Sequence, residues 1–166
     1  NLNRVVYGIK FAHYNLSGRG DKLRIYLLNG YARSIAFNYT APYSNGQLTE
    51  GFSLLGSFTQ TKEFPYKTSF ENKQLQFKKT DFVKNHFVIG ATYQRRRGYF
   101  NTHQYTVTYN YIKVNDSIIN TAYNPRYFNA TKSFIGYPDI KYSYLYSNTN
   151  NIKGFLQIKK VDLLNT

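Results

Sequence analysis

The sequence predicts an all-β protein built from antiparallel strands, and three features support that prediction. Several segments alternate between apolar and polar residues, which is the pattern of a strand whose two faces meet different surroundings. No segment keeps a helical repeat of apolar residues. The alternating segments are separated by turn-forming residues, and strands joined by short turns pair antiparallel.

The clearest predicted strand is residues 104–114, QYTVTYNYIKV. One face is apolar and aromatic, with Tyr105, Val107, Tyr109 and Tyr111, and the other is polar, with Gln104, Thr106, Thr108 and Asn110. Similar strands are predicted at residues 22–28, 34–40, 86–94 and 141–147. A weaker one covers residues 52–58, where Leu55 falls on the wrong face, and residues 154–164 form a strand with ambiguous faces. About seven strands follow from this pattern.

The connections between these strands alternate in length. Asn29 and Gly30 fit a two-residue hairpin in which both residues have positive φ. Short turns are also expected at residues 44–46, 95–99 and 148–151, whereas residues 61–81 and 115–138 form long links. Long loops on one rim and short turns on the other are typical of outer-membrane β-barrels.

The two faces of the predicted sheet suit different media. A face crowded with Tyr and Phe suits lipid, and a face of Thr, Ser, Asn and Gln suits a water-filled lumen. Backbone groups inside hydrocarbon must all be paired, so such a sheet has to close. The sequence therefore predicts an antiparallel transmembrane β-barrel. The alternative is a soluble barrel or sandwich that binds a glycan through its Tyr residues.

Composition excludes other classes. The 166 residues suggest one domain, and the absence of Cys excludes disulfides and thiolate chemistry. No apolar run approaches the roughly 20 residues that a spanning helix needs. The net charge of +14 is spread along the chain, and its only run, Arg95-Arg96-Arg97, precedes a turn glycine, so nucleic-acid binding is not expected.

Nothing in the sequence indicates catalysis. The three histidines, His13, His86 and His103, share no ligand-like spacing with one another or with a nearby carboxylate. The eight acidic residues fall mostly in links. We therefore expect no enzyme activity, no metal and no cofactor.

Four segments carry a family resemblance. NLSGRGDKLRI (residues 15–25) and SIAFNYTAPY (residues 34–43) resemble the start of the barrel in BamA/TamA-type outer-membrane assembly factors, the bacterial surface antigen family. That family shows an Asn-Leu-x-Gly-x-Gly corner between the last periplasmic POTRA domain and the first barrel strand, and a Pro-Tyr after the second strand. YQRRRGYFNTHQYTVTYNY (residues 93–111) and DSIINTAYNPRYF (residues 116–128) are similar to members from Bacteroidetes-like bacteria.

The resemblance implies a domain organisation and a location in the outer membrane of a Gram-negative cell. Residues 1–14 would be the end of a periplasmic POTRA-like domain or an extra strand. Residues 15–166 would be the N-terminal portion of the family's sixteen-stranded barrel. The long links and the turn at Asn29 would be extracellular. Implied partners are membrane lipid, client outer-membrane proteins, the remaining barrel strands and accessory lipoproteins.

The resemblance also implies a function without chemical catalysis, namely assembly and insertion of outer-membrane proteins. In this family the first barrel strand pairs poorly with the last, and an unpaired edge can template a client strand by β-augmentation. The implied gate strand consists of Lys22, Leu23, Arg24, Ile25, Tyr26, Leu27 and Leu28. Gly18 and Gly20 would let the corner bend, and Asn29 and Gly30 would form the turn. A transporter or channel barrel that exports a passenger is the alternative within the superfamily.

Overall fold

The computed structural model describes residues 4–69, 72–98, 100–119, 123–128, 132–148 and 151–160. Its strands are β1 (Val6–Tyr14), β2 (Lys22–Gly30), β3 (Ala32–Ala41), β4 (Glu50–Thr61), β5 (Glu63–Thr68), β6 (Gln74–Lys78), β7 (Lys84–Arg97), β8 (Asn101–Val114), β9 (Phe134–Asn148) and β10 (Asn151–Lys160). A 3₁₀ turn, η2 (Asp116–Ile118), follows β8. The all-β prediction is confirmed.

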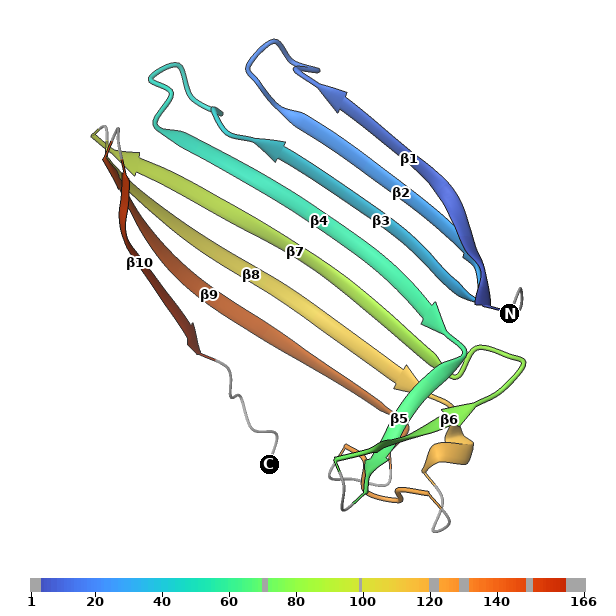
Figure 1. Cartoon of the computed structure of the whole chain (residues 1–166). Coiled ribbons are helices and arrows are strands. Elements are labelled where there is room, and N and C mark those ends of the chain that lie inside the picture. The colour runs from blue at the N-terminus through green and yellow to red at the C-terminus, as the bar shows by residue number, and fades with distance from the viewer. Residues whose placement is uncertain are drawn as a thin grey trace.

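Eight strands form one antiparallel sheet in the order β1-β2-β3-β4-β7-β8-β9-β10, and β5 and β6 form a separate hairpin. Each strand of the large sheet pairs with its neighbour along the chain, apart from the excursion through β5 and β6. The sheet is strongly curved, so that β1 and β10 lie at its two ends and one face is hollow (Figure 1). Within the described residues β1 and β10 do not pair, and the sheet stays open.

The predicted strands all fall on strands of this sheet, although most are longer than expected. Strands β7 and β8, for example, each have 14 residues. The last predicted strand begins earlier, at Asn151, and residues 161–164 lie outside the described residues. The hairpin of β5 and β6 lies inside the link predicted for residues 61–81. Short segments of this kind alternate too weakly to be distinguished from a loop.

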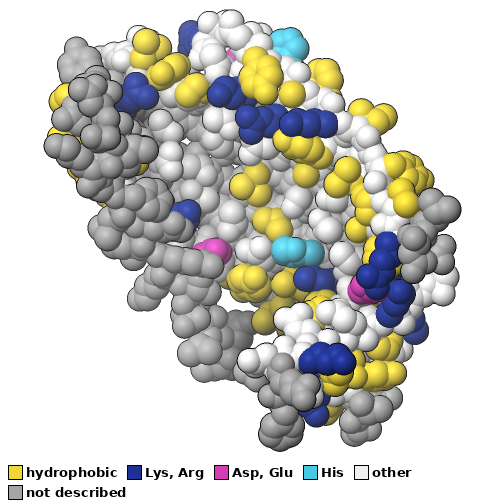
Figure 2. Space-filling model, viewed as in Figure 1, with side chains coloured by type: hydrophobic (Ala, Val, Ile, Leu, Met, Phe, Trp, Pro, Cys, Tyr) yellow, Lys and Arg dark blue, Asp and Glu magenta, His cyan; other side chains and the backbone are white. Residues whose placement is uncertain are grey.

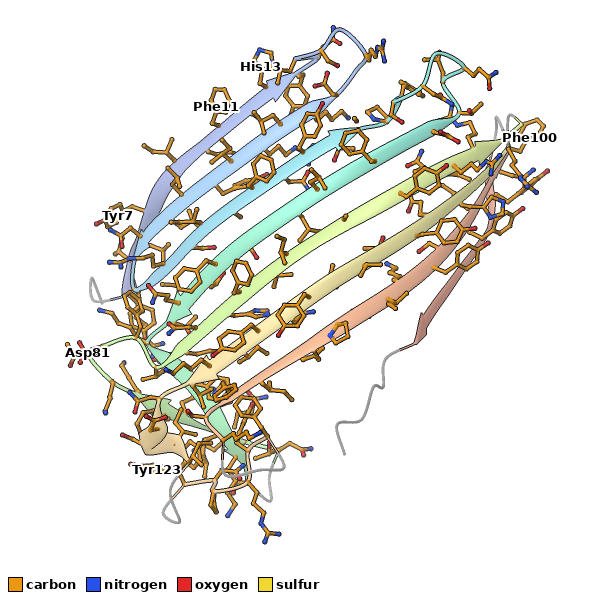
Figure 3. The ribbon with its side chains drawn as sticks, turned by 180° about the vertical axis from the view of Figure 1, so that it is seen from behind. Tyr7, Phe11, His13, Asp81, Phe100 and Tyr123 are labelled. Carbon is orange, nitrogen blue, oxygen red and sulfur yellow. The ribbon has the colours of Figure 1, made fainter. Side chains whose placement is uncertain are left out.

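The convex face carries the apolar set that the alternation predicted. Pairing aligns Leu54, Ala91, Val107 and Ile140 in one row across four strands, and Phe58, Phe87 and Tyr111 in another. These side chains project from the back of the sheet, as Figure 3 shows for Phe11 and Tyr7 on β1. Ile9 is 71% exposed and Val107 is 53% exposed. An extensive apolar surface is thus open on this side.

The concave face is polar and half-buried. Thr92 and Thr106 share a hydrogen bond of 2.9 Å across β7 and β8, and Gln104 donates to Gln94 at 3.1 Å. Leu55, the residue that breaks the alternation, lies on this face opposite Asn38 and Gly90. In the space-filling view this face is a trough with few apolar side chains toward its middle (Figure 2).

The two long links lie on the same rim of the sheet, as predicted, and pack against each other. Their small core is formed by Phe64, Phe77, Val83, Val114 and Ile118, all buried. Asn124 also donates a hydrogen bond of 2.9 Å to the Tyr66 carbonyl, which joins one link to the other. None of the described segments is a helix of the length and apolarity needed to cross a bilayer.

Candidate functional site

The predicted gate residues lie on β2, and their side chains point alternately to the convex and the concave face of the sheet. Leu23, Ile25 and Leu27 share the convex face, in register with Tyr39, Phe37 and Ile35 of β3. The remaining four residues of the set, Lys22, Arg24, Tyr26 and Leu28, share the concave side. Lys10 of β1 places its ammonium 5.4 Å from the centre of the Tyr26 ring on that side.

The expectation that this strand is a free edge is wrong. Strand β1 pairs with β2 over nine consecutive positions, from Val6 opposite Gly30 to Tyr14 opposite Lys22. Strand β3 covers the other side of β2. Residues 4–14 alternate in the same sense as β2, so antiparallel pairing across a short corner places both apolar faces together. The backbone groups of β2 are therefore satisfied on both sides, and the edge lies one strand further out.

The corner between β1 and β2 is held by its own polar groups. Asn15 donates from its backbone N–H to the Asp21 carbonyl at 2.6 Å, and its side-chain oxygen accepts from Gly20 N–H at 2.8 Å. Gly18 and Gly20 have φ of 79° and 75°, so the bend uses both glycines as expected. Ser17 donates to Asp21 Oδ1 from both its N–H and its Oγ at 2.9 Å.

Asp21 is the buried residue of this corner that sequence reasoning missed. It is fully shielded from solvent in the described structure. The backbone N–H of Ser17 lowers the pKa of the Asp21 carboxyl below its ordinary value, because this donor stabilises the charged form. A carboxylate placed directly before a strand and four residues after a serine was the available signal.

The turn after β2 is not the predicted two-residue hairpin. The last pair between β2 and β3 joins Leu28 to Ser34, so five residues connect the paired positions. Gly30 has a φ of 115°, but Asn29 is outside the left-handed region. The reason is β1: Val6 pairs with Gly30, and Tyr31 N–H donates to the Val5 carbonyl at 2.9 Å. The turn thus extends the ladder with β1 instead of closing tightly on β3.

The outer side of β1 is the candidate functional site. In an antiparallel ladder, alternate residues of an edge strand direct their N–H and C=O groups away from the only partner. Strand β1 has nine residues and no proline, and no described strand pairs with its outer side. Its convex side chains Tyr7, Ile9 and Phe11 are 62%, 71% and 51% exposed. The edge can therefore accept another strand whose apolar face continues the same surface.

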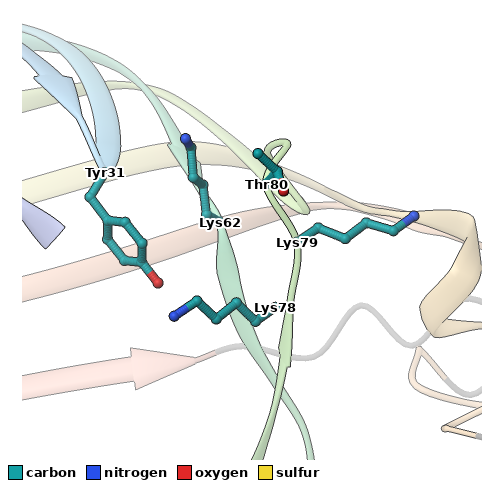
Figure 4. Close-up of a pocket in the computed structure, with 5 residues that line it drawn as sticks. All are labelled: Tyr31, Lys62, Lys78, Lys79 and Thr80. Carbon is teal, nitrogen blue, oxygen red and sulfur yellow. The ribbon is translucent and has the colours of Figure 1, made fainter. Parts of the chain in front are cut away.

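A cationic pocket lies on the rim of the long links, close to the start of β1. Tyr31, Lys62, Lys78, Lys79 and Thr80 line this pocket of about 640 Å³, and the Tyr31 hydroxyl faces the Lys78 ammonium (Figure 4). Glu63 beside it pairs with Arg4 at 2.7 Å and with Lys78 at 3.1 Å. Hydrogen bonding from Tyr31, followed by that from Lys78, lowers the pKa of Glu63, so this carboxylate stays charged.

The histidines do not form a site. His13, His86 and His103 lie on β1, β7 and β8, and His103 Nδ1 is 2.8 Å from the Tyr142 hydroxyl. No cluster of three or more His, Cys, Asp or Glu side chains that could hold a metal occurs among the described residues.

Comparison of the chain with protein-family models, with curated proteins and with solved structures finds no match. The family resemblance carried by residues 15–25 and 34–43 therefore stays a prediction. Any function has to be argued from the sheet and its edge.

Proposed function

We propose that this chain forms part of a transmembrane β-barrel in the bacterial outer membrane. The observation that supports this most is an apolar band on the convex face with a polar row at each end. One row consists of Arg33, Gln60, Asn85 and Lys113, and the other consists of Glu50, Arg95 and His103. Between these rows, β7 carries Phe87, Ile89, Ala91 and Tyr93 on the convex face.

The width of this band fits a bilayer. Asn85 and Arg95 lie ten residues apart on β7, which is about 33 Å along a strand. Strands of outer-membrane barrels are tilted by about 35–45°, so the two polar rows would be separated by about 25 Å along the membrane normal. That is the height of the lipid-facing band in this class of barrel.

Aromatic rings stand near both polar rows, as they do at membrane interfaces. Tyr93 lies beside Tyr105 with ring centroids 6.4 Å apart, and Tyr105 lies 5.2 Å from Tyr142. Toward the other row, the register aligns Phe58, Phe87 and Tyr111. The concave face, with its Thr–Thr and Gln–Gln pairs, suits the wet interior of such a barrel.

An open sheet in lipid leaves unpaired backbone groups at its ends, which is costly. The edges of β1 and β10 must then be covered by further strands or by a partner. We infer that the assembly role implied by the resemblance would act at β1, with residues 6–14 as the template and β2 as its support. A client strand would add to β1 by backbone hydrogen bonding, and its side chains would extend the apolar and polar faces.

The test is disulfide crosslinking in the complete protein in membranes. Single cysteines on β1, at Lys10 and Ala12, are paired with cysteines in the terminal strand of a client barrel. Cysteines at Ala36 and Asn38 of β3 serve as matched controls, because β3 is paired on both sides. Crosslinks from β1 alone support the proposal. Absence of client crosslinks, with full crosslinking of β1 inside its own barrel, would overturn the assembly role.

A transporter or channel is the second candidate, and the polar concave face favours it. The complete protein would then conduct ions in planar bilayers, and β1 would remain paired throughout transport. Conductance together with a permanently closed β1 edge would favour export over assembly.

A further inference from the structure

The start of the sheet, near the rim of the long links, combines an apolar groove with an adjoining group of cations. The groove, of about 330 Å³, lies against the ends of β1, β2 and β3. Its apolar lining includes Tyr7, Ile9, Leu27 and Ile35, and Asn29 and Arg33 also line it. Ile9 and Ile35 are 71% and 52% exposed, so the groove opens outward on the convex face.

Arg33 connects this groove to the cationic pocket. Its guanidinium lies 5.1 Å from the centre of the Phe82 ring, and the Lys62 ammonium lies 5.5 Å from the same centre. Lys62 lines the cationic pocket. Asn29 accepts a hydrogen bond of 3.2 Å from Arg33 Nε, which orients the guanidinium at the end of the groove. Two cations thus gather around one aromatic ring beside an apolar surface.

The charge around these two cations is unbalanced. Arg4, Arg33, Lys62, Lys78 and Lys79 outnumber the three carboxylates of this region, Glu63, Asp81 and Asp116, of which Asp116 lines a pocket together with Phe82. Glu63 is shared by Arg4 and Lys78. Within the described residues neither Arg33 nor Lys62 has an ion pair with a carboxylate. An anion bound between them would therefore gain attraction without displacing a carboxylate.

We propose that this corner of the sheet binds a phosphorylated lipid of the surrounding membrane, with an acyl chain in the groove and a phosphate between Arg33 and Lys62. The inference rests on the proposed membrane barrel, in which Arg33 belongs to the polar row that borders the lipid-facing band. Phosphate oxygens suit a planar guanidinium and a neighbouring ammonium. A long acyl chain suits the exposed apolar side chains of the groove, which lie next to that row on the side of the lipid-facing band.

The proposed site is more specific than the general attraction of a basic protein for anions. The opposite rim also carries cations, including Arg19 and Arg97. Neither of these two arginines lines the apolar groove, and Arg19 donates to the Ser44 carbonyl at 3.4 Å. The proposal therefore predicts a preference for lipids that combine a phosphate with acyl chains, at one rim only.

The test uses the complete protein purified in a non-ionic detergent and titrated with diphosphoryl lipid A, with bound lipid counted by native mass spectrometry. A lipid with the same acyl chains and no phosphate should bind at least tenfold more weakly. The double variant Arg33→Gln/Lys62→Gln should lose at least tenfold in affinity for the phosphorylated lipid. The double variant Arg19→Gln/Arg97→Gln removes the same charge from the other rim and should bind as the wild type does. Arg33→Lys should retain more binding than Arg33→Gln.

Two outcomes would overturn the proposal. One is equal binding of the phosphorylated and phosphate-free lipids, and the other is displacement of the lipid by millimolar inorganic phosphate, which would indicate a site for free anions. Membrane insertion is measured separately, by protease protection in lipid vesicles. Variants that insert normally but show no change in lipid selectivity refute the lipid site alone, whereas a wild-type protein that never inserts refutes the barrel itself.

Discussion

The backbone carbonyl of Val5 accepts a hydrogen bond of 2.9 Å from the backbone N–H of Tyr31. This bond ties the start of β1 to the turn between β2 and β3. It lies next to the pair of Val6 and Gly30, the last position at which β1 and β2 run side by side at this rim. The arrangement of β1, β2 and β3 at this rim therefore depends on the backbone conformation of Gly30.

We predict that Gly30→Val weakens this rim. A Cβ at Gly30 would overlap the Val5 carbonyl, and φ is 115°, which a β-branched residue resists. The expected loss is about 1–3 kcal/mol in the free energy of unfolding, measured by urea titration of the folded protein in detergent. Gly46→Val is the matched control, because a Cβ there meets nothing within 4 Å. Equal stability of the two variants would show that β1 does not hold this turn in place.

The alternation along the chain was enough to predict the sheet and its two faces. Residues 104–114 align with β7 and β9 in the register that their apolar face requires, because a slip by one residue would turn that face inward. The alternation could not predict which strand forms the edge of the sheet. Residues 4–14 and 22–28 alternate equally well, and only the pairing of Val6 through Tyr14 with β2 shows which one lies outside.

The turn at Asn29 was mispredicted for a related reason. An Asn-Gly pair between two strands favours a two-residue hairpin when only those strands are considered. Here a third strand competes for the same backbone groups, because Tyr31 donates to Val5. The packing of the long links against each other depends on contacts between residues as distant in sequence as Tyr66 and Asn124, which no local pattern reveals.

We predict that the two faces respond differently to charge. Tyr109 is 46% exposed on the convex face, in the row of Ile89 and Pro138, midway between the polar rows. Tyr109→Arg should cost about 2–4 kcal/mol in lipid, the amount expected for a lipid-facing position near the midplane. Thr108→Arg, on the concave side opposite Asp139, should be tolerated. Unfolding titrations in lipid vesicles give both values, and equal tolerance would favour the soluble glycan-binding alternative.

We predict a pH-dependent contribution of Asp21 to the corner. Its folded pKa is depressed, so its stabilising effect is present above the unfolded value of about 3.9 and is lost as pH falls through the lower folded value. Asp21→Asn should therefore destabilise the protein at pH 7, with a difference from the wild type that shrinks toward pH 3. Urea midpoints of both proteins across this pH range test the prediction. If the difference in urea midpoint instead grows on acidification, the charged Asp21 carboxylate does not stabilise the corner, and the prediction is wrong.

The last prediction concerns orientation. The hairpin of β5 and β6 turns at Asn72, which is exposed and has a φ of 55°, and it belongs to the rim of the long links. Gly98 follows β7 at the opposite rim and has a φ of 65°. If the long links are extracellular, an epitope tag inserted at Asn72 should bind antibody on intact cells, and a tag at Gly98 should bind only after the outer membrane is permeabilised. Both insertions fall in exposed turns outside the paired sheet, so neither should prevent folding. Antibody binding at Gly98 on intact cells, with Asn72 accessible only after permeabilisation, would reverse the orientation and place the cationic pocket on the periplasmic side.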